Sequence, residues 1–209
     1  MHMDKAMMFG MWYVGTAIKE IPSSIQRLRG LQCLVLSNCK NLVNLLESIC
    51  NLTSFKILIV KSCPNFKKLP DNLGRLQSLL RLIVGHLDSM NFPLPSLSGL
   101  CCLRTLKIQG CNLREFPSEI YYLSSLVTLS LGGNHLSRIP DWISQLYNLK
   151  DLDLGHCKML QHIPELPSGL FRLHHCTSLE NLCRQSNLLW SSLFKCFKSQ
   201  IQVWFSYII

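Results

Sequence analysis

Apolar residues recur along the chain in groups that share one internal spacing. In the stretch LKDLDLGHC, residues 149–157, leucines stand at Leu149, Leu152 and Leu154, and Cys157 follows. The gaps of three, two and three residues fit neither a helical period nor simple strand alternation. The central L-x-L pair alone places both of its leucines on one face of a short strand. We therefore expect a short strand that is followed at once by a turn.

The same group returns at regular intervals. Its last strand position recurs 24, 24, 24, 23 and 23 residues apart, at Leu36, Val60, Val84, Ile108, Leu131 and Leu154. A shorter unit follows at Leu173, and AIKEIPSSIQRL, residues 17–28, matches only the second half of a unit. This is the leucine-rich-repeat pattern L-x-x-L-x-L-x-x-[N/C]-x-L. The predicted fold is an α/β leucine-rich-repeat solenoid, with a curved parallel sheet on the concave side and irregular or short helical segments on the convex side.

A small side chain stands three residues after the last strand position in most units. These residues are Cys39, Cys63, Cys111, Asn134, Cys157 and Cys176. A thiol or an amide at this position can donate a hydrogen bond inward to the backbone of the turn. Leu87 takes the place in one unit and offers no donor, so we expect a local irregularity near residues 85–97.

Prolines mark the segment that leads from each strand to the next. They are Pro22, Pro70, Pro117, Pro140 and Pro164. Proline cannot donate to a central strand, so these residues belong to the return segments on the convex side. The sequences PSEIYYL and PDWISQL predict helical turns that begin at the proline.

Composition adds limits to this picture. The chain has 209 residues, of which 48% are hydrophobic and 16% charged, so it can bury a core and is not disordered. Its net charge of +9 suits an acidic protein, a membrane surface or nucleic acid without choosing among them. The eleven cysteines form no disulfide framework, which predicts reduced thiols in the cytoplasm or the nucleus. No apolar run reaches the ~18 residues of a membrane span.

No grouping of residues indicates catalysis. The sequence has no Ser–His–acid set, no oriented Cys–His pair and no phosphate-binding loop, so we expect neither an enzyme nor a cofactor. The stretches HC, residues 156–157, and HHC, residues 174–176, suit zinc chemically. Both cysteines are expected to point into the core, so we predict no metal site. Lys67-Lys68 is the only adjacent basic pair, and we predict no nucleic-acid site.

The residues that alternate with the strand leucines are expected to face outward on the concave side. They form an apolar cluster of Val35, Ile57, Ile59 and Ile83. A basic border is formed by Lys61, Arg81 and Lys107, and an acidic end by Asp151 and Asp153. We hypothesise that this set is a protein-contact surface. The alternative is that β-branched residues occur there simply because they favour strands.

The units resemble a known family. Together with GTAIKEIPSSI, residues 15–25, and IPELPSGLFRLHHCTSLENL, residues 163–182, they look like plant intracellular immune receptors of the nucleotide-binding leucine-rich-repeat class that carries a TIR domain. The resemblance implies that the repeats recognise a pathogen effector or a guarded host protein, or pack on a nucleotide-binding domain. It also implies a location in the cytoplasm, with the nucleus as a second site. No TIR or nucleotide-binding motif is present, so no nucleotide cofactor is implied for any residue here.

The sequence predicts three parts. Residues 1–14 form a non-repeat segment, residues 15–182 form the repeat domain, and residues 183–209 look like the start of the β-rich domain that follows the repeats in the family. Neither end offers the polar cap that a solenoid needs, so we expect a fragment of a longer receptor. The alternatives are a short stand-alone binder capped by residues 1–14, an adaptor or the substrate-recognition part of a ubiquitin ligase, and an extracellular receptor fragment glycosylated at Asn51.

Overall fold

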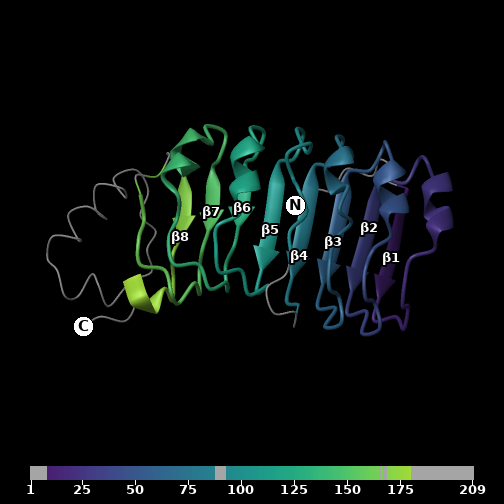
Figure 1. Cartoon of the computed structure of the whole chain (residues 1–209), viewed down its shortest axis with the longest axis horizontal. Coiled ribbons are helices and arrows are strands. Elements are labelled where there is room, and N and C mark those ends of the chain that lie inside the picture. Colours follow the sequence, from purple (N-terminus) through teal and green to yellow (C-terminus); the bar gives the residue numbers. More distant parts are fainter. Residues whose placement is uncertain (1–8, 88–92, 165, 167–168, 180–209) are drawn as a thin grey trace, which may run out of the picture.

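A computed structural model describes residues 9–87, 93–164, 166 and 169–179. Within these residues, parallel strands lie side by side in chain order and form one open sheet (Figure 1). The strands are β1 (Gly10–Val14), β2 (Cys33–Ser37), β3 (Ile57–Lys61), β4 (Arg81–Gly85), β5 (Thr105–Gln109), β6 (Thr128–Ser130), β7 (Asp151–Asp153) and β8 (Leu170–Arg172). The predicted parallel sheet of a leucine-rich-repeat solenoid is confirmed.

The strands pair without a slip in register. One buried row crosses the sheet through Leu34, Leu58, Leu82, Leu106, Leu129 and Leu152. A slip of one residue would turn every leucine of a strand outward, so burial of this row fixes the register. The constant phase of the L-x-L pair in each unit is therefore what aligns the strands.

Short 3-10 helices form on the return segments, and they include the two turns that PSEIYYL and PDWISQL predict. They are η1 (Ser23–Arg27), η2 (Glu47–Asn51), η3 (Leu73–Arg75), η4 (Ser118–Tyr122) and η5 (Asp141–Gln145). Pro22, Pro117 and Pro140 directly precede η1, η4 and η5. The fixed φ of proline suits the start of such a turn. Figure 1 shows these turns along one edge of the row of strands.

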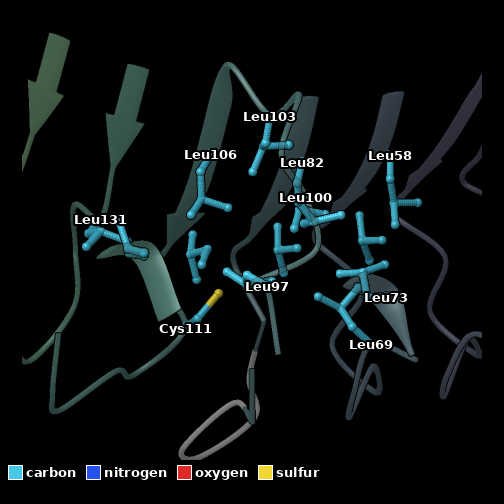
Figure 2. Close-up of a cluster of buried hydrophobic side chains, with 14 of the residues drawn as sticks. Leu58, Leu69, Leu73, Leu82, Leu97, Leu100, Leu103, Leu106, Cys111 and Leu131 are labelled. Carbon is cyan, nitrogen blue, oxygen red and sulfur yellow. The ribbon is translucent and has the colours of Figure 1, made fainter. Parts of the chain in front are cut away.

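The core lies between the sheet and the return segments. Figure 2 shows Leu58, Leu82 and Leu106 of the strands meeting Leu69 and other leucines of the return segments. All of these side chains are buried. Each unit buries its apolar side chains only by packing against the neighbouring units, so the core runs continuously through the stack.

The inward donors predicted three residues after each strand position are confirmed. The thiols of Cys63, Cys157 and Cys176 donate to the backbone carbonyl oxygens of Leu36, Leu131 and Leu154, at 3.7, 3.4 and 3.3 Å. Each acceptor is the last leucine of the L-x-L pair in the preceding unit, which lies at the end of the strand or directly after it. We call these inward positions the donor ladder. Its hydrogen bonds join the turn of each unit to the strand end of the preceding unit.

The residue before each ladder position has a positive φ. These residues are Gly15, Asn38, Ser62, His86, Gly110, Gly133, His156 and His175. The left-handed conformation turns the chain sharply after the strand, and this turn brings the next side chain inward. The sequence places mostly glycine, asparagine, serine and histidine there, and glycine adopts this conformation without strain.

The sheet begins earlier than the repeats read from the sequence. Strand β1 lies inside residues 1–14, the segment that the pattern left outside the repeat domain, and it pairs in parallel with β2. Met11 and Tyr13 take the places of the two strand leucines, which is why the pattern does not detect them. The thiol of Cys39 donates to the carbonyl oxygen of Tyr13 at 3.3 Å, so the ladder also reaches this strand.

The irregular unit is only partly within the described residues. Strand β4 runs to Gly85 in full register with β5, and Leu87 is buried. The expected irregularity over residues 85–97 includes residues 88–92, which lie outside the described residues. Residues 93–98 form no helical turn, unlike the return segments of neighbouring units. The C-terminal part expected at residues 183–209 also lies outside the described residues.

Candidate protein-binding face

The residues that alternate with the buried strand leucines form the second surface of the sheet, which we call the sheet face. The strand register aligns them in rows across the strands. The central row runs through Trp12, Val35, Ile59, Ile83, Lys107, Ser130, Asp153 and Arg172. The predicted outward columns are therefore adjacent in space.

An apolar strip occupies the central row on strands β2 to β4. Val35 and Ile59 are half-buried, and Ile57 lies beside Ile59 in the neighbouring row. Ile83 is only 7% exposed, whereas the sequence predicts an outward and accessible side chain. Ile59 and Lys107 flank it on the two adjacent strands, and this close packing of neighbours accounts for its burial.

Two residues that sequence reasoning missed extend this strip. Trp12 and Val14 of β1 are 60% and 61% exposed, and Trp12 stands directly beside Val35. The indole of Trp12 lies over Gly10, where any Cβ would collide with the ring. The signal in the sequence is Gly15-Thr16 after GMWYV. It has the same turn chemistry as the later units, without leucines in front of it.

The basic residues border the apolar strip as the sequence predicts. Lys61 follows Ile59 by two residues on β3, and Arg81 precedes Ile83 by two residues on β4. Lys107 stands opposite Ile83 on β5. Residues two apart on a strand share a face, so these cations surround the Ile59–Ile83 pair. Arg81 is exposed, and both lysines are half-buried.

The acidic residues are already engaged within the sheet. Asp151 forms an ion pair with Arg172 at 2.7 Å. Asp153 accepts hydrogen bonds from the Ser130 hydroxyl at 2.9 Å and from the backbone N–H of Gly155 at 3.0 Å. Arg172 therefore neutralises Asp151, whereas Asp153 keeps its charge and is held in place by neutral donors. Arg172 escaped notice because its unit is shorter than the others.

Histidines cluster beside this acidic end. The rings of His174 and His175 lie 4.9 and 4.7 Å from that of His156, measured between centroids. Burial lowers the pKa of His156, and the two neighbouring imidazoles lower it further. Cys157 and Cys176 are buried and donate to the ladder, so they point away from the histidines. Among the described residues, no group of side chains has the geometry to hold a metal ion.

A second group of apolar side chains lies on the return segments. The aromatic rings of Phe116 and Tyr121 pack edge-on against Trp142, at centroid distances of 5.5 and 5.8 Å. Tyr122 and Tyr147 are also exposed on these segments.

Within the part of the chain that the structure covers, no helix combines the length and apolar character needed to cross a membrane.

Comparison with known proteins agrees with this architecture. The family model described as leucine rich repeat matches residues 94–159. The leucine-rich repeat domain of the type III effector XCV3220 (XopL) has a TM-score of 0.69 and 22% identity, covering 84% of this chain and 63% of that chain. The Leptospira interrogans LRR protein LIC12759 has a TM-score of 0.51 and 26% identity, covering 76% and 48%. These likenesses show the fold.

Similar curated proteins come from plants. The disease resistance-like protein DSC1 of Arabidopsis thaliana is 34% identical over 196 residues, covering 80% of this chain and 16% of its own length. TMV resistance protein N of Nicotiana glutinosa is 37% identical over 157 residues, covering 74% and 14%. The chain thus spans only 14% to 16% of the length of these two relatives. The chain folds as a leucine-rich-repeat solenoid, and it is similar to segments of plant disease resistance proteins.

Proposed function

We propose that this chain is a protein-recognition module in plant innate immunity and that the sheet face is its binding surface. The partner is a pathogen effector, a host protein guarded by the receptor, or a nucleotide-binding domain. The module acts in the cytoplasm or nucleus as part of a receptor of the TIR type, and it has no catalytic role of its own. Binding that favours one receptor state over another is what turns recognition into a signal.

The observation that carries this proposal is the apolar strip on the sheet face. Trp12 is a large aromatic side chain that is 60% exposed, and it continues directly into Val35 and Ile59. Aromatic residues with low backbone mobility are enriched at the centres of protein interfaces. Val35 and Ile59 stand on β2 and β3, which are paired on both sides and form a rigid base, and Trp12 stands beside them on the end strand β1.

Matched surface variants test the proposal. The chain is expressed in leaf tissue as a fusion to a proximity-labelling enzyme, and the labelled proteins are quantified by mass spectrometry. The test variant is Trp12→Ser with Ile59→Ser. The control variant is Tyr122→Ser with Tyr147→Ser, which removes comparably exposed rings, at 61% and 87%, from the return segments.

The expected result is a set of proteins whose labelling falls about tenfold in the sheet-face variant and is unchanged in the control. Circular dichroism and thermal melting establish that both variants fold. Labelling that survives in the folded sheet-face variant would show that this face does not bind. Labelling lost only in the control would move the binding surface to the aromatic group on the return segments.

A further inference from the structure

Basic residues on the sheet face outnumber the acidic residues that could pair with them on strands β1 to β5. Strands β1 to β5 contain no aspartate or glutamate. Among the described residues, the ion pairs are Lys68–Asp71 and Arg172–Asp151. Lys61, Arg81 and Lys107 therefore form no ion pair with an acid in the part of the chain that the structure describes. These three cations lie on consecutive strands, whose spacing is about 4.8 Å. From the strand register and a rise of about 3.3 Å per residue, the Cα of Lys107 lies about 8 Å from that of Arg81. The Cα of Lys61 lies about 12 Å from that of Lys107 and about 14 Å from that of Arg81, so the three charges border the apolar strip at separate points.

The acids that stand closest to them on the sheet are on β7, two strands beyond β5. Asp153 is held by Ser130 and by the backbone of Gly155, and Gln109 also approaches its carboxylate at 3.4 Å. Asp151 is paired with Arg172, whereas the donors to Asp153 are neutral and leave its charge on β7. Strands β2 to β6 carry no acidic residue, so the cations of β3 to β5 have no acid on their own strands or on the adjoining ones.

From this arrangement we infer that the partner segment is an acidic polypeptide carrying large apolar side chains. This inference rests on the proposed function and names the chemistry of its ligand. The apolar side chains of the segment pack on Trp12, Val35 and Ile59, and its carboxylates pair with the surrounding cations. Charge complementarity of this kind raises the association rate and excludes basic competitors.

The arrangement favours a polypeptide over a nucleic acid. A single-stranded nucleic acid needs cations that track its backbone together with aromatic rings on which bases stack. Here the side chains between the cations are Ile57, Ile59 and Ile83, and the exposed aromatic ring, Trp12, stands two strands away from Lys61. Aliphatic side chains offer bases no stacking surface, but they suit the leucines and phenylalanines of a peptide.

The test uses a phage-displayed library of random peptides of about a dozen residues, selected on the purified chain. The reversal variant is Lys61→Glu, Arg81→Glu and Lys107→Glu. Its control is Lys67→Glu, Arg138→Glu and Lys150→Glu, which changes the same residue types at exposed positions outside the sheet. Both variants shift the net charge equally. The neutral variant Trp12→Ser with Ile59→Ser removes the apolar strip without changing charge.

The expected peptides are rich in aspartate, glutamate and large apolar residues. Their affinity falls about tenfold or more in the reversal variant, holds in its control, and weakens as NaCl rises from about 0.05 to about 0.5 M. Selected peptides no more acidic than the starting library would overturn the inference. If the neutral variant loses the peptides while the reversal variant keeps them, the sheet face still binds and only the acidic ligand is refuted. A single-stranded oligonucleotide that outcompetes the peptides would also refute it.

Discussion

The side-chain amide of Asn134 donates a hydrogen bond of 2.7 Å to the backbone carbonyl oxygen of Ile108, one repeat earlier. It also donates to Leu131, again at 2.7 Å, and its carbonyl oxygen accepts from the backbone N–H groups of Cys111 and Leu113 at 3.0 and 3.2 Å. All four bonds are buried. The thiols at equivalent positions donate only, so this asparagine ties its two units together more fully than any cysteine of the ladder can.

Replacement of Asn134 by alanine should therefore destabilise the chain severely. It leaves two buried N–H donors and two carbonyl oxygens without this partner, and each buried unsatisfied group costs about 1–3 kcal/mol. We expect the free energy of unfolding to fall by about 3 kcal/mol or more, measured by urea denaturation monitored by circular dichroism.

Two further variants sharpen this measurement. Asn148→Ala removes one exposed hydrogen bond, to the carbonyl oxygen of Ser124 at 2.9 Å, and should cost well under about 1 kcal/mol. Asn134→Cys keeps an inward donor and should cost less than Asn134→Ala. Equal losses for the alanine and cysteine variants at position 134 would show that donation to Ile108 contributes little.

Regular spacing is the reason that most of the fold could be predicted. The last strand positions from Leu36 to Leu154 recur every 23 or 24 residues. Because the same residue pattern starts at the same point of every unit, it predicts the strand register, the buried rows and the donor ladder together. The helical turns η4 and η5 follow from the prolines that precede them, whereas η2 begins after Leu46 and has no such signal. Strand β1 could not be predicted in this way, because Met11 and Tyr13 replace the leucines and only the turn chemistry of Gly15 remains.

The candidate site was predictable only in part. Successive side chains of a strand point to opposite faces, and this rule depends on local geometry alone. It therefore places Val35, Ile59 and the cations on the correct face of the sheet. Burial of Ile83 and pairing of Asp151 with Arg172 depend on contacts between units. Such contacts follow from side-chain conformation and unit length, which the repeat pattern does not encode.

Backbone conformation gives a second stability prediction. Gly133 has a φ of +70° and precedes Asn134, and a Cβ at this position would make only ordinary contacts. Gly133→Ala should therefore lower the free energy of unfolding by about 1–2 kcal/mol through backbone strain alone. Gly133→Asn should cost less, because Asn38 adopts the same conformation in its own unit. Gly30→Ala is the control. Thermal melts in which all three variants match the parent would contradict this explanation.

Thiol reactivity should divide the cysteines by position. Cys101 and Cys102 are exposed, whereas the other cysteines that the structure describes are buried. We expect iodoacetamide to label these two in the folded chain and to reach the buried ones only in urea, as read by peptide mass spectrometry. The side-chain hydrogen bond between Cys101 and Cys102 raises the pKa of Cys102, and the negative charge of the Cys101 thiolate raises it further.

The rate at which iodoacetamide alkylates Cys102 tests the effect of its neighbour. Cys101→Ala removes the neighbour that raises the pKa, so Cys102 should be alkylated faster at neutral pH because more of it is thiolate. Rapid labelling of Cys63 or Cys157 in the folded chain would mean that the donor ladder opens readily to solvent.

Stability should also fall at alkaline pH because of a ladder thiol. Burial raises the pKa of Cys111 from 9.0 to about 12. Between these values the unfolded chain loses a proton that the folded chain keeps, so stability is complete below about pH 9 and declines toward about pH 12. The contribution of this thiol should decline by up to about 1.4 kcal/mol per pH unit within that range.

Urea unfolding of the parent and of Cys111→Ala at about pH 8 and about pH 10 gives the slope of the unfolding free energy against pH for each chain. The contributions of residues that titrate alike in both chains cancel in the difference between the two slopes. Parallel slopes would show that Cys111 ionises in the folded chain as easily as in the unfolded one, which its complete burial argues against.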